Sequence, residues 1–193
     1  MSRYTIKDIT SNLKRIAKSV VEPETAWNNE ATEPESKSQI VWGFLIPLMA
    51  ICSTVSFLGV FLINQDIWFA IRHLIAAFVN GLLGVVAISY IANELSTSFG
   101  GTKNMAKALK LVTFSASVFF LVASISRFMP TFKVFFMLLG IYSLYIFYKG
   151  LAPMLSIKPE RKVGFVFIIF LLFAMVVFII ELLLGPLFSL TLA

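Results

Sequence analysis

Five long apolar stretches follow one another along residues 40–193, behind a polar tail that occupies residues 1–38. Hydrophobic residues make up 59% of the chain, and charged residues are largely confined to the tail and to the gaps between the stretches. A helix of about 20 apolar residues crosses a hydrocarbon core about 30 Å thick, and helices are expected because lipid offers no partner to a free backbone group. The sequence therefore predicts an all-α integral membrane protein with five transmembrane helices. We expect the spans at about residues 40–63, 68–93, 109–128, 131–149 and 163–184, within one domain of residues 39–193.

The distribution of basic residues predicts how these spans are oriented. Of the 16 Lys and Arg residues, Arg72, Arg127 and Lys133 fall on one side, and the others lie in the tail and in the second and fourth loops. Loops rich in Lys and Arg stay on the cytoplasmic side of a membrane. The N-terminus is therefore expected in the cytoplasm and the C-terminus outside. The basic residues then face anionic lipids, which explains the net charge of +6 without nucleic acid.

The third and fourth spans are short and are joined by a tight turn at residues 128–131. Two topologies are open at this point. The two segments either cross the membrane completely or form a re-entrant hairpin that enters from the cytoplasmic side. Both leave the C-terminus outside, and the length criterion favours five complete spans.

The tail begins with an amphipathic pattern over about residues 5–21. Apolar residues recur at spacings of three and four, and most of the basic residues lie off that stripe, which is typical of an amphipathic helix. The stripe consists of Ile6, Ile9, Leu13, Ile16 and Val20. Thr5 and Asp8 resemble a capping box at its start. Such a helix lies either in the membrane interface, on anionic lipids, or on the protein's own cytoplasmic loops.

Residues 22–36 are rich in glutamate and contain Pro23 and Trp27. The acidic composition favours a solvated linker. Trp27 argues for more order, because a large aromatic ring in a polar linker usually packs against something.

Several elements of the chain resemble one known family when they are taken in order. A Pro-x-x-x-Trp element, Pro23 to Trp27, precedes the first span, and Ile46-Pro47-Leu48 lies early in that span. The fourth span ends in a tyrosine-rich segment that carries Tyr142, Tyr145, Tyr148 and Gly150. This order resembles the Yip domain family of Ypt-interacting proteins, and specifically its short prokaryotic members.

The resemblance implies a fold with five spans and a cytoplasmic N-terminus. It also implies a place in a membrane, which for a prokaryotic member is the bacterial inner membrane. Eukaryotic relatives are small membrane proteins of the early secretory pathway that bind Rab-type GTPases and one another. The resemblance therefore points to membrane or cytoplasmic proteins as partners. Small residues on the helix faces, such as those around Asn80, favour self-association, so a homo-oligomer is a further expectation.

The three tyrosines also have a physical interpretation of their own. Tyr142, Tyr145 and Tyr148 are spaced by three residues, so they share a helix face near the expected cytoplasmic boundary. This pattern is typical of an aromatic belt or a helix contact, and an interaction element that includes Pro23 and Trp27 is the functional alternative. Gly150 and Pro153 are expected to end the helix.

Polar residues inside the apolar spans are functional candidates, because they are costly there. We hypothesise a polar cluster that faces the bundle interior, and the alternative is a set of separate anchors at the outer boundary. The candidates are Arg72, His73, Asn80, Arg127 and Glu181. Asn80 lies among small residues in the middle of its span, which favours close helix contact.

No recognisable catalytic or metal-binding spacing is present in the sequence. The chain has one cysteine, Cys52, and one histidine, His73, so we expect no metal, no cofactor and no enzyme activity. Two functions are carried forward. The first is a non-catalytic adaptor or scaffold that binds other proteins, or itself, through its cytoplasmic face. The alternative is a protein that moves a small solute, an ion or a lipid along a polar path between helices.

Overall fold

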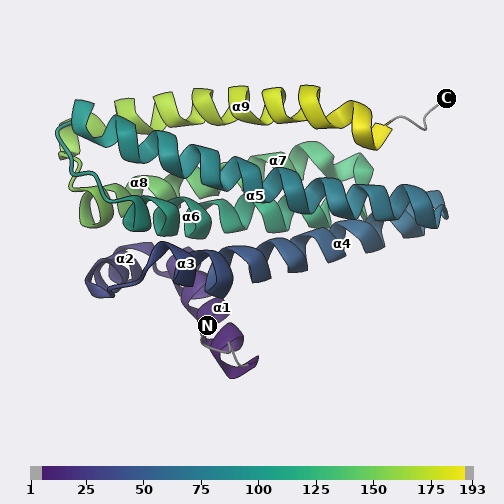
Figure 1. Cartoon of the computed structure of the whole chain (residues 1–193), viewed down its shortest axis with the longest axis horizontal. Helices are drawn as coiled ribbons and strands as arrows, with labels where there is room; N and C mark the ends of the chain where they lie inside the picture. Colours follow the sequence, from purple (N-terminus) through teal and green to yellow (C-terminus); the bar gives the residue numbers. More distant parts are fainter. Residues whose placement is uncertain (1–5, 190–193) are drawn as a thin grey trace.

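The structure of the chain is a computed structural model that describes residues 6–189. Across this range the chain is helical, with 88% of residues in helices and no strand. Five helical segments are long and apolar enough to cross a membrane, as the hydropathy pattern predicted. They lie side by side in an elongated bundle, with the tail packed against one end (Figure 1).

The tail forms three helices. Helix α1 spans Ile6–Val21, α2 spans Pro23–Thr32 and α3 spans Lys37–Ile40. The expectation of a solvated linker was therefore wrong for residues 23–32. Pro23 occupies the start of α2 and Glu24 its first turn, which are the positions where a proline and an acidic residue are favourable.

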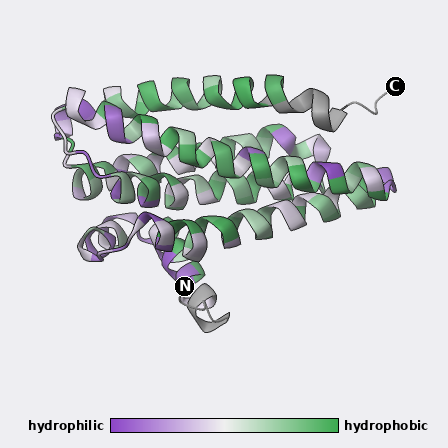
Figure 2. Cartoon of the chain, viewed as in Figure 1, coloured by the Kyte–Doolittle hydropathy of each residue, from purple (hydrophilic) through white to green (hydrophobic). Residues whose placement is uncertain are grey.

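Each membrane segment is one helix or a short series of helices. The first segment, Lys37–Asn64, passes from α3 through the π-helical turn η1 into α4, and the fourth, Pro130–Leu155, combines η2, α7 and α8. The bounds are Val41–Leu45 for η1, Ile46–Asn64 for α4, Ile67–Ser98 for α5, Met105–Ile125 for α6, Pro130–Phe132 for η2, Lys133–Gly140 for α7, Tyr142–Leu155 for α8 and Pro159–Ser189 for α9. Hydrophobic residues dominate the middle of these helices in Figure 2.

Helix α8 continues past the two residues that were expected to end it. It runs through Gly150 and Pro153 to Leu155, and it ends where Ser156 adopts a left-handed backbone conformation with φ 58°. Pro153 costs this helix one backbone hydrogen bond in its last turn. The burial of Leu151, Met154 and Leu155 offsets that cost.

The tightness of packing differs between the two ends of the bundle. The largest buried side chains include Trp27 of α2, Phe44 and Phe114, and the rings of Trp27 and Phe44 both pack on Phe114. At the opposite end α7 packs on α6, and Gly140 is the one buried residue of α7. One end is therefore a solid core, and the other is an open arrangement of apolar side chains.

The turn between α6 and η2 lies at the same end of the bundle as the turn between α4 and α5 (Figure 1). Helix α6 has 21 residues and is therefore about 32 Å long at about 1.5 Å per residue. Directly after it, Arg127 packs on Gly59 of α4, where an added Cβ would lie 2.8 Å from the Cβ of Arg127. The length of α6 favours five complete spans over a re-entrant hairpin.

The two topologies and the predicted orientation make different predictions for Thr131 in the α6–α7 turn. In a Cys52→Ser background, we expect Thr131→Cys to react with a membrane-impermeant maleimide on intact cells. The control, Lys158→Cys in the exposed α8–α9 loop, should react only after the cells are permeabilised. Protection of residue 131 under both conditions would support the re-entrant hairpin, and the reverse labelling pattern would invert the orientation.

Candidate functional site

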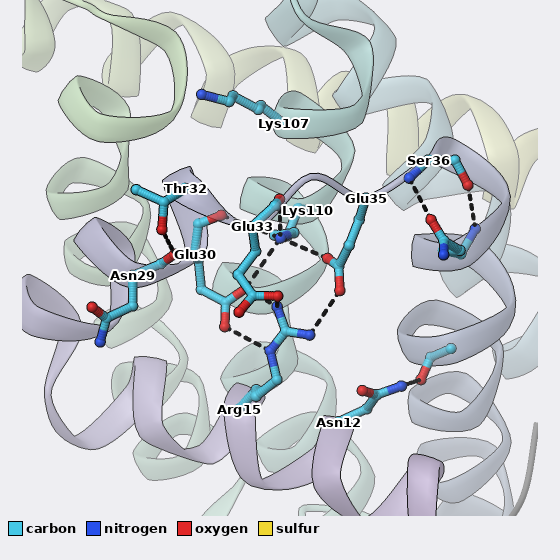
Figure 3. A network of polar contacts seen from close by, with 12 residues as sticks. Asn12, Arg15, Asn29, Glu30, Thr32, Glu33, Glu35, Ser36, Lys107 and Lys110 are labelled. Atoms are coloured by element: carbon cyan, nitrogen blue, oxygen red, sulfur yellow. Dashed lines mark hydrogen bonds and ion pairs between the residues drawn. The ribbon is translucent and has the colours of Figure 1, made fainter.

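The most heavily charged contact between the tail and the bundle is a group of four residues, which we call the ion network. It joins Arg15 of α1, Glu30 of α2, Glu35 of the α2–α3 loop and Lys110 of α6. Figure 3 shows the Arg15 and Lys110 side chains meeting the two carboxylates from opposite sides. Three tail segments are thereby held against one membrane helix.

Lys110 is the buried member on the bundle side. Its side chain is only 2% exposed, because α6 carries it into the core between Leu109 and Leu111. The Nζ atom lies 3.1 Å from Oε2 of Glu30 and 2.6 Å from Oε2 of Glu35, and it donates to the Glu30 carbonyl oxygen at 3.2 Å. An ammonium group taken out of water needs such partners, since a buried unpaired charge is very costly.

Arg15 closes the network from the tail side. Its Nε donates to Oε1 of Glu30 at 2.8 Å, a second nitrogen pairs with Oε2 of the same carboxylate, and Nη1 donates to Oε1 of Glu35 at 2.7 Å. The guanidinium also lies over the Phe44 ring, 4.9 Å from its centroid. The planar fork of arginine suits this two-pronged contact with a carboxylate.

Two cations and two carboxylates leave the ion network formally neutral. Burial by itself would raise the pKa of the Glu35 carboxyl, but Lys110 and Arg15 outweigh burial and hold that pKa below its usual value. Burial would likewise lower the pKa of Arg15, yet its contacts with Glu30 and Glu35 raise that pKa overall. Glu35 and Arg15 are therefore charged at neutral pH.

A tryptophan anchor lies next to the ion network. Trp27 is 0% exposed, and its Nε1 donates to the Ile146 carbonyl oxygen of α8 at 3.0 Å. Its ring packs on Phe114, with 5.9 Å between centroids, and on Gly150, where an added Cβ would lie 2.8 Å from Cε2 of Trp27. Gly150 thus gives the indole ring room to approach the backbone of α8.

Helix α1 uses two further polar contacts to lie on the bundle. Pro47 has no N–H to offer the Gly43 carbonyl four residues earlier, and Nδ2 of Asn12 donates to that oxygen at 3.0 Å. At the other end of α1, Tyr142 donates its hydroxyl to the Val20 carbonyl oxygen at 2.9 Å. With Ile16 buried as well, the second half of α1 packs on the protein itself.

The tyrosine segment and the Pro-x-x-x-Trp element meet in this region. Trp27 and Gly150 are in direct contact, whereas Tyr142 and Tyr145 stack on each other at the surface with centroids 5.5 Å apart. The Lys162 ammonium of α9 lies over the Tyr148 ring, 5.2 Å from the ring centroid. Pro23 is buried at the start of α2.

Sequence reasoning did not single out the ion network. The local signal is Lys110, which the distribution of basic residues assigns to the second loop although it falls at the edge of the expected third span, residues 109–128. Its partners Glu30 and Glu35 belong to an acidic stretch in which nothing local distinguishes them from Glu33. In the structure the Glu33 carboxylate lies at the edge of the ion network, 3.9 Å from Arg15.

Among the polar residues of the spans, His73 lies within electrostatic range of both Arg72 and Arg127. His73 and Arg127 line one cavity at the end of the bundle opposite the tail, and Arg72 and Asn80 are not among its lining residues. Arg72 Nε and Asn80 Oδ1 are buried without a hydrogen-bond partner in the described part of the chain. Glu181 belongs to α9, and its side chain lies outside the described residues.

Comparison with known proteins gives one finding. The Yip1 domain matches residues 17–180, a range that includes the tryptophan anchor and three of the four ion-network residues. No curated protein and no solved structure matches the chain. Among the described residues no cluster of His, Cys, Asp or Glu could hold a metal ion.

Replacing Lys110 should uncouple the tail from the bundle. In Lys110→Met the side chain keeps its length and loses its charge, so Glu30 and Glu35 remain buried with Arg15 alone. We expect the free energy of unfolding in mixed micelles to fall by about 3 kcal/mol. We also expect a protease to cleave residues 22–36 faster than in the unmodified protein.

Lys107 is the matched control, because it lies on the same helix and forms no ion pair among the described residues. Lys107→Met should change the free energy of unfolding by no more than about 0.5 kcal/mol. Equal stability of the Lys110→Met and Lys107→Met variants would show that the ion network does not hold the tail.

The ion network should also make tail attachment sensitive to acid. The folded-state pKa of Glu35 lies below its ordinary value of 4.5, so its contribution is complete above about pH 4.5 and is lost as the pH falls through the folded-state value. In a Trp42→Phe/Trp68→Phe variant, Trp27 emission should stay blue at neutral pH and shift to the red below about pH 4.5. A red shift on raising the pH from 7 to 9 would contradict this mechanism.

Proposed function

This chain belongs to the Yip1 domain family, and on that premise we propose that it is a non-catalytic membrane adaptor that binds protein partners through its tail. The observation that carries the proposal is the ion network. It holds a polar segment, which could otherwise remain disordered, in one position on the bundle. A surface ordered before binding loses less conformational entropy when a partner arrives.

The contact surface in this proposal is the outer side of α2, which we call the tail face. It is polar and acidic, with no exposed large hydrophobic side chain on α2. Its residues on α2 and at the two ends of α2 are Glu22, Glu24, Thr25, Asn28, Asn29, Thr32 and Glu33. Such a surface suits a reversible contact with a basic protein surface, for which complementary charge supplies specificity and rate of association.

The family supports a protein as the class of partner. Eukaryotic members interact with Rab-type GTPases, and from them we carry over to this chain a protein partner, without a particular GTPase. The buried Trp27 and Gly150 then act as the support of the tail face, and Tyr145 is exposed beside it. The orientation with the tail in the cytoplasm would place this face where soluble proteins can reach it.

Movement of a solute or lipid along a polar path is the alternative function. It draws support from the cavity that His73 and Arg127 share. It lacks a continuous path, because Arg72 and Asn80 do not line that cavity. We therefore place the adaptor first.

The adaptor proposal predicts where protein neighbours will be found. A photo-crosslinking amino acid at position 28 or 29 of α2 should form protein adducts in cells. The same group at position 178, where Phe178 is exposed on the apolar face of α9, should react with lipid instead. The adducts from α2 should be lost in the Lys110→Met background and kept in the Lys107→Met background.

Two outcomes would count against the proposal. Protein adducts at position 178 but none at positions 28 and 29 would move the contact to the membrane-facing surface. Adducts at positions 28 and 29 that persist in Lys110→Met would show that partner binding does not need the ordered tail.

A further inference from the structure

The end of the bundle opposite the tail holds a cavity with a cationic edge. Its volume is about 430 Å³, and Arg127, Lys133 and His73 contribute to its lining. No carboxylate lines it in the part of the chain that the structure describes. Neither Arg127 nor Lys133 forms an ion pair with a described residue. Among the described residues, the charge at this edge therefore has no carboxylate partner.

A second cavity, of about 360 Å³, lies next to the first. The two share Phe119 of α6 and Met137 and Gly140 of α7, so they adjoin one another. The second cavity is lined almost entirely by apolar side chains of α6, α7, α8 and α9. We call the two adjoining cavities the groove, which has a cationic edge in the first cavity and an apolar lining in the second.

The fourth segment is broken beside this groove. It breaks at Ile141, between α7 and α8. Both helices pack on α6, and α8 also packs on α9. Gly140 lets the chain approach α6 closely at the break, since an added Cβ would lie 3.2 Å from the Phe119 ring. Before the break, the α7 side chains Val134, Met137 and Leu138 are exposed.

We propose that this groove binds an anionic phospholipid, with the phosphate at Arg127 and Lys133 and one acyl chain between α6, α7 and α9. The cationic edge lies near the α6–α7 turn, at the end of an apolar segment, which is the level of lipid headgroups. Each cavity falls within the range of about 300–1,000 Å³ typical of ligand sites. An acyl chain would cover apolar side chains that the protein itself leaves uncovered.

No residue of the tail face lines either cavity of the groove. The proposed lipid site can therefore be tested independently of the adaptor function. Arg127 is fixed in place by the close contact between its Cβ and Gly59 of α4. Lys133 begins α7 and so moves with the helix that borders the groove.

The test is native mass spectrometry of the full chain after incubation with equal amounts of phosphatidylglycerol and phosphatidylcholine of the same acyl composition. The unmodified protein should retain phosphatidylglycerol in preference by about tenfold or more, since each nearby cation favours an anionic lipid. Arg127→Gln/Lys133→Gln should lose this preference. Lys107→Gln/Lys158→Gln, which removes two cations at the opposite end, should keep it.

A second variant tests the apolar part of the site. Ala116→Phe fills the groove from α6 and should reduce retention of both lipids. Val134→Trp obstructs the same groove from an exposed position and serves if Ala116→Phe does not fold. Retention of both lipids at the unmodified level by the folded variant would overturn the acyl-chain assignment.

Two further results would overturn the proposal as a whole. Equal retention of the two lipids by the unmodified protein would show that the cationic edge does not distinguish an anionic from a zwitterionic headgroup. Displacement of phosphatidylglycerol by an excess of inorganic phosphate would identify a site for a soluble anion, without a role for the groove. Resistance to phosphate, together with the loss of preference in Arg127→Gln/Lys133→Gln, supports the lipid site.

Discussion

The buried ammonium of Lys110 is the constraint on which the arrangement of the tail depends. Because α6 is apolar, it packs among the membrane-spanning segments, and Lys110 is buried in the core as part of that helix. A charge in that position needs carboxylates, and Glu30 and Glu35 are the ones that reach it. Since both lie before the first span, α2 and the loop after it must fold back on the bundle, and Arg15 then balances the second negative charge.

Buried ion pairs of this kind specify geometry more than they add stability, because desolvation offsets much of the attraction between the charges. The apolar contacts of Trp27 with Phe114 and Gly150 contribute much of the free energy that holds the tail on the bundle. The ion network then selects one position of the tail among those that bury the indole ring. This division of roles gives a polar surface with a fixed position, which is what the proposed adaptor function requires.

The two ends of the bundle differ because their helices are held together differently. At the tail end large side chains, the ion network and three tail helices form a continuous core. At the other end α7 is short, is separated from α8 by a break and contributes one buried residue, Gly140. A membrane tolerates such an end because lipid chains can occupy the space that side chains do not fill. The proposed phospholipid is a specific case of that filling.

The sequence alone determined the membrane segments, the amphipathic α1 and the family, because these depend on local length, periodicity and the order of short motifs. It suggested that Trp27 is ordered, but its acidic composition predicted a solvated linker where the structure has α2. Only the tertiary structure decided that Lys110 meets Glu30, 80 residues away, and that His73 shares a cavity with Arg127 but not with Asn80. Local patterns report how each segment divides between water and lipid. Which charges become partners depends on how the helices pack, and that information is spread over the whole chain.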